Sequence, residues 1–174
     1  MDEMLIETQR LWLVPLTLEE LRRALTSKLQ LAEELGFQLY SSELDDKMKS
    51  IYQIKIDKIE RDKENYLFYT FWQLVLKEEK MIIGEVGFKG VSQETGELEV
   101  GFGTEERFRN KGYMTEALTE LIKWAFIQEK PDIKRITALT LKDNIPSQKV
   151  LEKAGLMLKH EEAGQVYWHV DKSK

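Results

Sequence analysis

The sequence predicts a mixed α/β domain of the α+β type, in which helices flank a mostly antiparallel, twisted sheet. Segments with alternating apolar residues are interspersed with segments whose apolar residues recur every three or four positions. Short loops join the central strands, whereas one strand–helix–strand unit over residues 97–141 requires a parallel pair. The length of 174 residues, with 42% hydrophobic and 33% charged residues, suits one globular domain, which we expect to cover residues 1–174.

The first third of the chain begins with a strand and continues as helices. Arg10–Pro15 is typical of a strand that ends at a proline. Thr17 and Glu20 form a capping box, and apolar residues at spacings of three and four extend the predicted helix to Leu35. Residues 43–63 mix helical and alternating patterns, but their high charge and lack of glycine and proline favour a helix.

The rest of the chain alternates between strands and helices. The pattern predicts strands over Tyr66–Leu76, Met81–Phe88, Glu97–Gly103, Arg135–Leu141 and Val166–Val170. A helix from about Lys111 to Glu129 separates the third and fourth of these strands and stops before Pro131. A last helix is capped by Asn144 and ends at Gly155.

Composition excludes several classes of protein. No apolar run approaches the length that spans a bilayer, and the acidic start lacks the features of a secretory signal. The absence of cysteine excludes disulfides and thiolate sites and fits a cytoplasmic location, which we expect. With two histidines and no cysteine we expect no metal site. The net charge of −5 argues against a nucleic-acid partner.

The turn that enters the predicted helix at Lys111 concentrates positive charge. Arg107, Arg109 and Lys111 stand within five residues, directly before Gly112. A helix N-terminus carries about half a positive charge and several unpaired N–H groups, so it binds anions. Gly112 lets the backbone approach a pyrophosphate with no Cβ in the way. The alternative is a loop that only connects a strand to a helix. Positive side chains at a helix N-terminus are unfavourable to the helix dipole, so this alternative does not explain why they are there. The sequence therefore favours a phosphate site.

The common phosphate and hydrolase motifs are absent from the sequence. There is no P-loop motif, and Gly101-x-Gly103 lacks the third glycine of the dinucleotide fingerprint. The nucleophile-elbow and zinc-protease motifs are absent as well.

Three segments resemble the GNAT N-acetyltransferase superfamily. Arg109–Leu118 is similar to its acetyl-CoA motif, Q/R-x-x-G-x-G/A, and Asn144–Leu156 is similar to its second block, N-x-x-S-x-x-v-l-E-K-x-G-F. Glu7–Thr17 resembles the first residues of the branch that acetylates ribosomal proteins. Two departures stand out, because Met114 replaces the usual glycine or alanine and Leu151 replaces the tyrosine that protonates the leaving thiolate in many members.

The resemblance implies that acetyl-CoA binds between two splayed parallel strands, here residues 97–103 and 135–141. It places Glu99 as the general base, acting directly or through a water, although Glu97 and Glu99 share one strand face and both could instead face solvent. Asn144 and Ser147 could bind the pantetheine or only cap their helix. The expected cofactor-binding residues are Val100, Gly101, Phe102, Arg107, Arg109, Asn110, Lys111, Gly112, Tyr113, Met114, Thr115, Asn144 and Ser147.

The resemblance therefore implies an acetyl-CoA-dependent N-acetyltransferase. Its acceptor would be a protein N-terminal amine or a small-molecule amine, with no nucleic-acid or membrane partner, and the protein would be a monomer or a homodimer. Two alternatives stay open. One is a non-catalytic acyl-CoA-binding or sensing domain of the same fold, which remains possible because residue 151 is leucine and not tyrosine. The other is a nucleic-acid-binding module that uses the Arg107–Lys111 segment.

Overall fold

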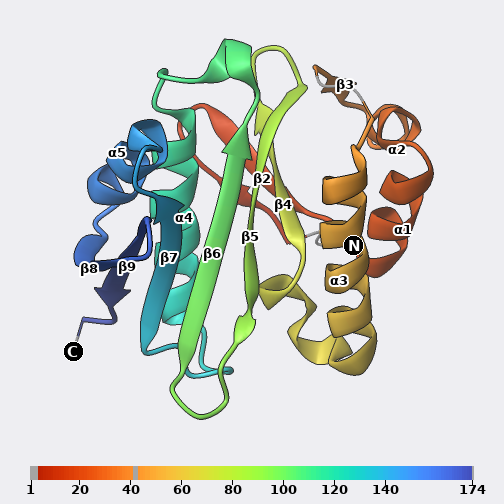
Figure 1. Ribbon diagram of the computed structural model, residues 1–174. Coiled ribbons are helices and arrows are strands. Elements are labelled where there is room, and N and C mark those ends of the chain that lie inside the picture. The colour runs from red at the N-terminus through yellow and green to blue at the C-terminus, as the bar shows by residue number, and fades with distance from the viewer. Residues whose placement is uncertain (1–3, 41–42, 174) are drawn as a thin grey trace.

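The computed structural model describes residues 4–40 and 43–173, and in these residues nine strands form one sheet (Figure 1). The strand order is β1-β2-β4-β5-β6-β7-β9-β8, and β3 pairs with β5. The strands are β1 (Ile6–Glu7), β2 (Leu11–Pro15), β3 (Gln38–Leu39), β4 (Phe71–Leu76), β5 (Met81–Val91), β6 (Glu97–Thr104), β7 (Arg135–Leu141), β8 (Met157–Glu162) and β9 (Gln165–Asp171).

Helices cover the sheet in two groups. The helices are α1 (Leu18–Thr26), α2 (Lys28–Glu34), α3 (Asp46–Arg61), α4 (Tyr113–Ile127) and α5 (Ile145–Lys153), with short 3-10 turns η1 (Lys63–Phe68) and η2 (Glu106–Phe108). Helices α1 to α3 lie together beside β4, whereas α4 and α5 lie near β6 and β7 (Figure 1). No helix in the described part of the chain is long and apolar enough to cross a membrane.

The prediction of a mostly antiparallel sheet is confirmed. Parallel pairing is confined to β6 with β7 and β3 with β5, and the remaining paired strands in the described residues are antiparallel. The predicted parallel pair at residues 97–103 and 135–141 is therefore present as β6 and β7.

Strands β6 and β7 separate towards their carboxyl ends. Their pairing runs from Glu97 opposite Arg135 only to Val100 opposite Ala138. Beyond that point β6 continues to Thr104 and β7 to Leu141. Because each strand residue directs its N–H and C=O to one neighbour, alternate backbone groups of β6 after Val100 are left without a β7 partner. The splayed edge predicted from the family resemblance is thus part of the sheet.

The largest core cluster lies between the sheet and α4. The helix buries a stripe at spacings of three and four, formed by Met114, Ala117, Leu118, Leu121, Ile122 and Ala125. On β6, the alternate residues Leu98 and Val100 are buried in the same cluster. The opposite face of β6 therefore carries Glu97, Glu99, Gly101 and Gly103.

Two expectations about individual elements were wrong. The helix predicted from Thr17 to Leu35 is interrupted at Ser27, whose extended backbone ends α1 and whose side chain caps α2 by accepting from the N–H of Gln30. The strand predicted from Tyr66 begins only at Phe71, because η1 occupies the preceding residues. The sequence left open a second closing strand but gave no bounds for it, since the residues of β8 are exposed on both faces and show no apolar alternation.

Candidate functional site

The turn between β6 and α4 leaves backbone amides free at the start of the helix. Asn110 and Gly112 both have left-handed backbone, with φ of 61° and 79°. Gly112 is the N-cap of α4, and no side chain of the described residues caps this helix. The N–H groups of the first turn therefore keep their capacity to bind an anion.

A cavity of about 540 Å³ opens at this turn. We call it the turn cavity. Its wall is formed by the turn, the start of α4, the end of β6 and one side of α5. The cavity is lined by three basic side chains, Arg109, Lys149 and Lys153, and by no acidic one among the described residues. Free amides and positive charge together make it suited to a phosphate group.

Nine of the expected cofactor-binding residues line the turn cavity, namely Phe102, Arg109, Asn110, Gly112, Tyr113, Met114, Thr115, Asn144 and Ser147. The other four do not. Val100 is buried in the core, Gly101 lines a second cavity, and Arg107 lies 5.8 Å from the ring of Tyr40. The Lys111 ammonium lies 5.4 Å from the ring of Phe108.

Sequence reasoning missed Lys149 and Lys153, which also line the turn cavity. Their i, i+4 spacing places both on one face of α5, and this was the available signal. Asn144 accepts a hydrogen bond from the N–H of Ser147, so it caps α5 while lining the cavity.

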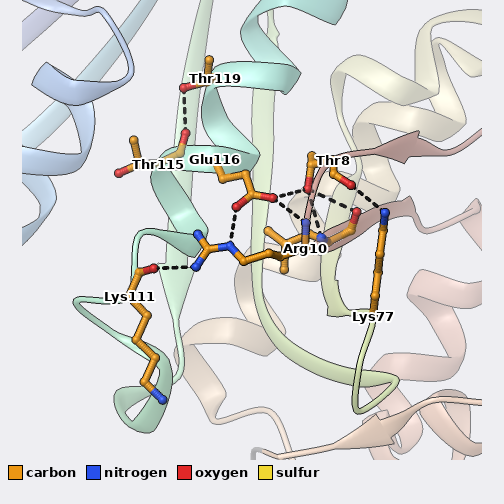
Figure 2. A network of polar contacts seen from close by, with 8 residues as sticks. Thr8, Arg10, Lys77, Lys111, Thr115, Glu116 and Thr119 are labelled. Carbon is orange, nitrogen blue, oxygen red and sulfur yellow. Dashed lines mark hydrogen bonds and ion pairs between the residues drawn. The ribbon is translucent and has the colours of Figure 1, made fainter.

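A polar network ties the turn to the N-terminal strands (Figure 2). Glu116, in the first turn of α4, accepts hydrogen bonds from the Thr8 hydroxyl at 2.6 Å, the Arg10 N–H at 2.8 Å and Arg10 Nε at 2.7 Å. Arg10 Nη1 in turn donates to the carbonyl of Lys111 at 3.0 Å, and its guanidinium lies 4.4 Å from the centre of the Tyr113 ring. Arg10 therefore holds both sides of Gly112.

Glu116 is ionised in this network. Burial raises its pKa, but the hydrogen bonds from Thr8 and Arg10, together with the Arg10 charge, outweigh burial, so the pKa lies below its usual value.

A second cavity, of about 590 Å³, lies between α3 and the sheet. We call it the sheet cavity. Phe102, Gly103, Thr104 and Arg109 line both cavities, so the two meet at the carboxyl end of β6. The sheet cavity has a lining of mixed charge, and its carboxylates distinguish it from the turn cavity. Four carboxylates and four basic side chains line it, namely Glu43, Asp45, Glu85, Glu105, Lys28, Lys55, Lys89 and Arg109.

The space above two glycines on the floor of the sheet cavity is open. A Cβ added at Gly103 would meet no atom within 4 Å, and one at Gly101 would meet only the Lys89 side chain, at 3.8 Å. A ligand in this cavity can therefore lie directly on the β6 backbone.

Two titratable groups stand out beside this floor. Glu99 lies on the same face of β6 as Gly101, but it lines neither cavity and forms an ion pair with Lys89. Lys55 lines the sheet cavity and donates to the carbonyls of Tyr69 and Phe88. Burial lowers the pKa of Lys55 to about 7, because the Glu85 charge only partly offsets it.

The second family-like block, at α5, has Leu151 at the position where the resemblance led us to expect a tyrosine. Leu151 is fully buried in the core cluster beneath α4. It can neither donate a proton nor contact a ligand.

Comparison with known families decides the classification. The family described as "Acetyltransferase (GNAT) domain" matches residues 10–157. The chain belongs to the GNAT acetyltransferase family. The resemblance predicted from the sequence is thereby confirmed, and the mixed sheet with its parallel β6–β7 pair is the GNAT fold.

Several relatives of this GNAT chain are known. It is 42% identical over 100 residues to the uncharacterized N-acetyltransferase YjdG of Bacillus subtilis, covering 58% of each chain. Thus the chain spans little more than half the length of this relative. The ribosomal-protein-S5-alanine acetyltransferase of Vibrio fischeri has a TM-score of 0.69 at 18% identity, with 97% of each chain covered. RimL, a ribosomal L7/L12 α-N-protein acetyltransferase solved with coenzyme A, has a TM-score of 0.67 at 16% identity, covering 97% of this chain and 98% of RimL.

Proposed function

We propose that the protein is an acetyl-CoA-dependent N-acetyltransferase that acts on a primary amine, either a protein N-terminus or a small molecule. The observation that carries the proposal is the meeting of two chemically different cavities at the end of β6. The turn cavity is basic and rich in free amides, whereas the sheet cavity carries carboxylates together with an equal number of basic side chains. A phosphorylated donor and a cationic acceptor would thus reach the same strand from two sides.

The turn cavity fits coenzyme A. The amides after Gly112 and the side chains of Arg109, Lys149 and Lys153 would bind its phosphates. The pantetheine would lie in the gap where β6 and β7 separate, and the free backbone groups of β6 after Val100 would hydrogen-bond it. When bound, acetyl-CoA supplies the activated acyl group as a thioester.

The sheet cavity would hold the acceptor amine over Gly101 and Gly103. An amine attacks only when it is neutral, so a base must take its proton. We propose Glu99 for this role. Because Glu99 does not line the cavity, its carboxylate would act through a water and would first have to leave Lys89. Free β6 N–H groups would stabilise the oxyanion that forms during transfer.

Release of free thiol from acetyl-CoA tests the proposal. The assay covers a panel of N-terminal peptides, polyamines, aminoglycosides and amino acids, with calorimetry for coenzyme A measured in parallel. We expect coenzyme A to bind and at least one amine to accelerate thiol release. Binding without turnover across the panel would favour the acyl-CoA-binding alternative, which the buried Leu151 supports. No binding of coenzyme A would overturn both.

A further inference from the structure

Glu85 is a buried carboxylate at the floor of the sheet cavity. It lies on β5 directly opposite Gly103 of β6, so it flanks the open space above that glycine. Only 8% of the residue is exposed. A buried charge persists only when hydrogen bonds or an opposite charge compensate it.

One oxygen of Glu85 receives all of its side-chain hydrogen bonds from the described residues. Oε2 accepts from the Tyr52 hydroxyl at 2.8 Å, from Lys28 Nζ at 3.2 Å and from Gln73 Nε2 at 3.2 Å. These donors come from α3, α2 and β4, so three elements fix the carboxylate. Burial and the Glu85 charge raise the pKa of Tyr52, which keeps its hydroxyl protonated as a donor.

The other oxygen of Glu85 is available to a ligand. Oε1 accepts no hydrogen bond from the described residues, although each carboxylate oxygen can accept two. Two other carboxylates of the cavity are already engaged. Glu43 accepts from backbone N–H groups at the start of α2, and Asp45 caps α3 through the N–H of Met48. Glu85 is therefore the carboxylate that is both fixed by its neighbours and free at one oxygen.

The walls above Glu85 are largely apolar. Met48 and Ile51 of α3 and Leu44 before it line one side, and Phe71 and Ile82 line the sheet side. A ligand that places a cation at Glu85 would bury an apolar body against these side chains. Burial of apolar surface would then add to the affinity.

From this geometry we propose that Glu85 Oε1 accepts a hydrogen bond from the ammonium group of the acceptor, and that the preferred acceptors are primary amines carried on an apolar body. This inference rests on the proposed function, because it assigns the sheet cavity to the acceptor. It makes Glu85 a specificity-determining residue that holds the amine above Gly103, where the two cavities meet.

The test compares two probes of the same shape, 2-phenylethylamine and 2-phenylethanol, by ligand-observed NMR titration of the whole chain. A hydrogen bond to a buried charge discriminates by about tenfold or more. We expect the wild type to bind the amine at least about tenfold more tightly than the alcohol. Glu85→Gln should bind both probes equally.

Three further measurements keep the result interpretable. Glu85→Gln leaves Lys28 buried without its partner, so the double variant Glu85→Gln, Lys28→Met supplies a neutral pair that preserves the packing. Glu97→Gln, on the same sheet face but outside the cavity, should keep the preference for the amine. Calorimetry with coenzyme A reports on the turn cavity in every variant.

The outcomes separate this inference from the proposed function. Equal binding of both probes by the wild type overturns the inference, and so does a preference that survives in Glu85→Gln and in the double variant. Failure of the wild type to bind coenzyme A overturns the proposed function, whatever the probes show.

Discussion

Replacement of Glu116 by alanine tests whether the network around Arg10 supports the turn cavity. Glu116 does not line that cavity, but it fixes Arg10, which donates to the carbonyl of Lys111 just before Gly112. The substitution removes three hydrogen bonds to a carboxylate, from Thr8 and from Arg10. It also leaves a half-buried guanidinium without its counter-charge.

The magnitude follows from those contacts. Hydrogen bonds to charged groups contribute about 1.5–3 kcal/mol each, but three that share one carboxylate are not additive, so we expect a loss of about 3 kcal/mol. For a chain of this size, 1 kcal/mol corresponds to about 2–4 °C, so the melting temperature should fall by roughly 6–12 °C. Because the turn loses its support, the Kd for coenzyme A should rise by about tenfold, which is 1.4 kcal/mol.

Thermal unfolding and calorimetry with coenzyme A measure the two effects. Glu120→Ala is the matched control, since Glu120 lies one turn further along α4 and forms only a surface ion pair with Lys123. Such a pair contributes about 0–1 kcal/mol, so the control should retain its melting temperature and its affinity.

The dependence on pH checks the same reasoning. The lowered pKa of Glu116 means that its stabilisation is fully present above the pKa of an unfolded glutamate and is lost as the pH falls through the folded value. Glu116→Gln should therefore differ least from the wild type in acid. If Glu116→Ala melts like Glu120→Ala, or binds coenzyme A as tightly as the wild type, the network does not support the turn.

Further predictions address the glycine of the turn, the proposed base and the buried lysine. Gly112→Ala places a Cβ on a residue with φ of 79°, so it should lose about 1–2 kcal/mol of stability and also bind coenzyme A more weakly. Gly155 also has positive φ but lies outside the turn cavity, so Gly155→Ala should lose only stability. Glu99→Gln should lower turnover about tenfold or more with the Kd for coenzyme A unchanged, and an unaltered rate would remove Glu99 from the mechanism. Burial lowers the pKa of Lys55 to about 7, so between pH 7 and about 10 the unfolded chain binds more protons than the folded chain. The free energy of unfolding of the wild type, measured with urea, should therefore rise across this pH range. Lys55→Met should lack this contribution.

Local patterns in the sequence were enough to predict most elements of the fold. The capping box at Thr17 and the apolar stripe of α4 each depend on residues within a few turns, and both are present. The break at Ser27 was missed because the apolar spacing continues through it. Ser27 with Gln30 three residues later was an available capping signal.

Local patterns could not predict contacts between residues that are far apart in the sequence. Glu85 and its partner Lys28 are 57 residues apart, and Arg10 and Glu116 are 106 apart. The turn before α4 was proposed as a phosphate site from its own residues, but the sequence could not show that Arg10 contacts that turn or that Glu85 lies opposite Gly103. Those relations depend on strand register, which is fixed by the packed sheet.

The distribution of charge is compatible with the proposed phosphate site, although the chain as a whole is acidic. The net charge is −5, and Glu116 adds a negative charge to the first turn of α4, where it would weaken an anion site. Arg10 and Thr8 hold that carboxylate outside the turn cavity, and Arg10 offsets its charge. The cavity keeps Arg109, Lys149 and Lys153, while the carboxylates gather across β6 in the sheet cavity. Under the proposed function, a phosphorylated donor would meet a cavity whose described lining holds no carboxylate, and the acceptor amine would meet one whose four carboxylates include Glu85.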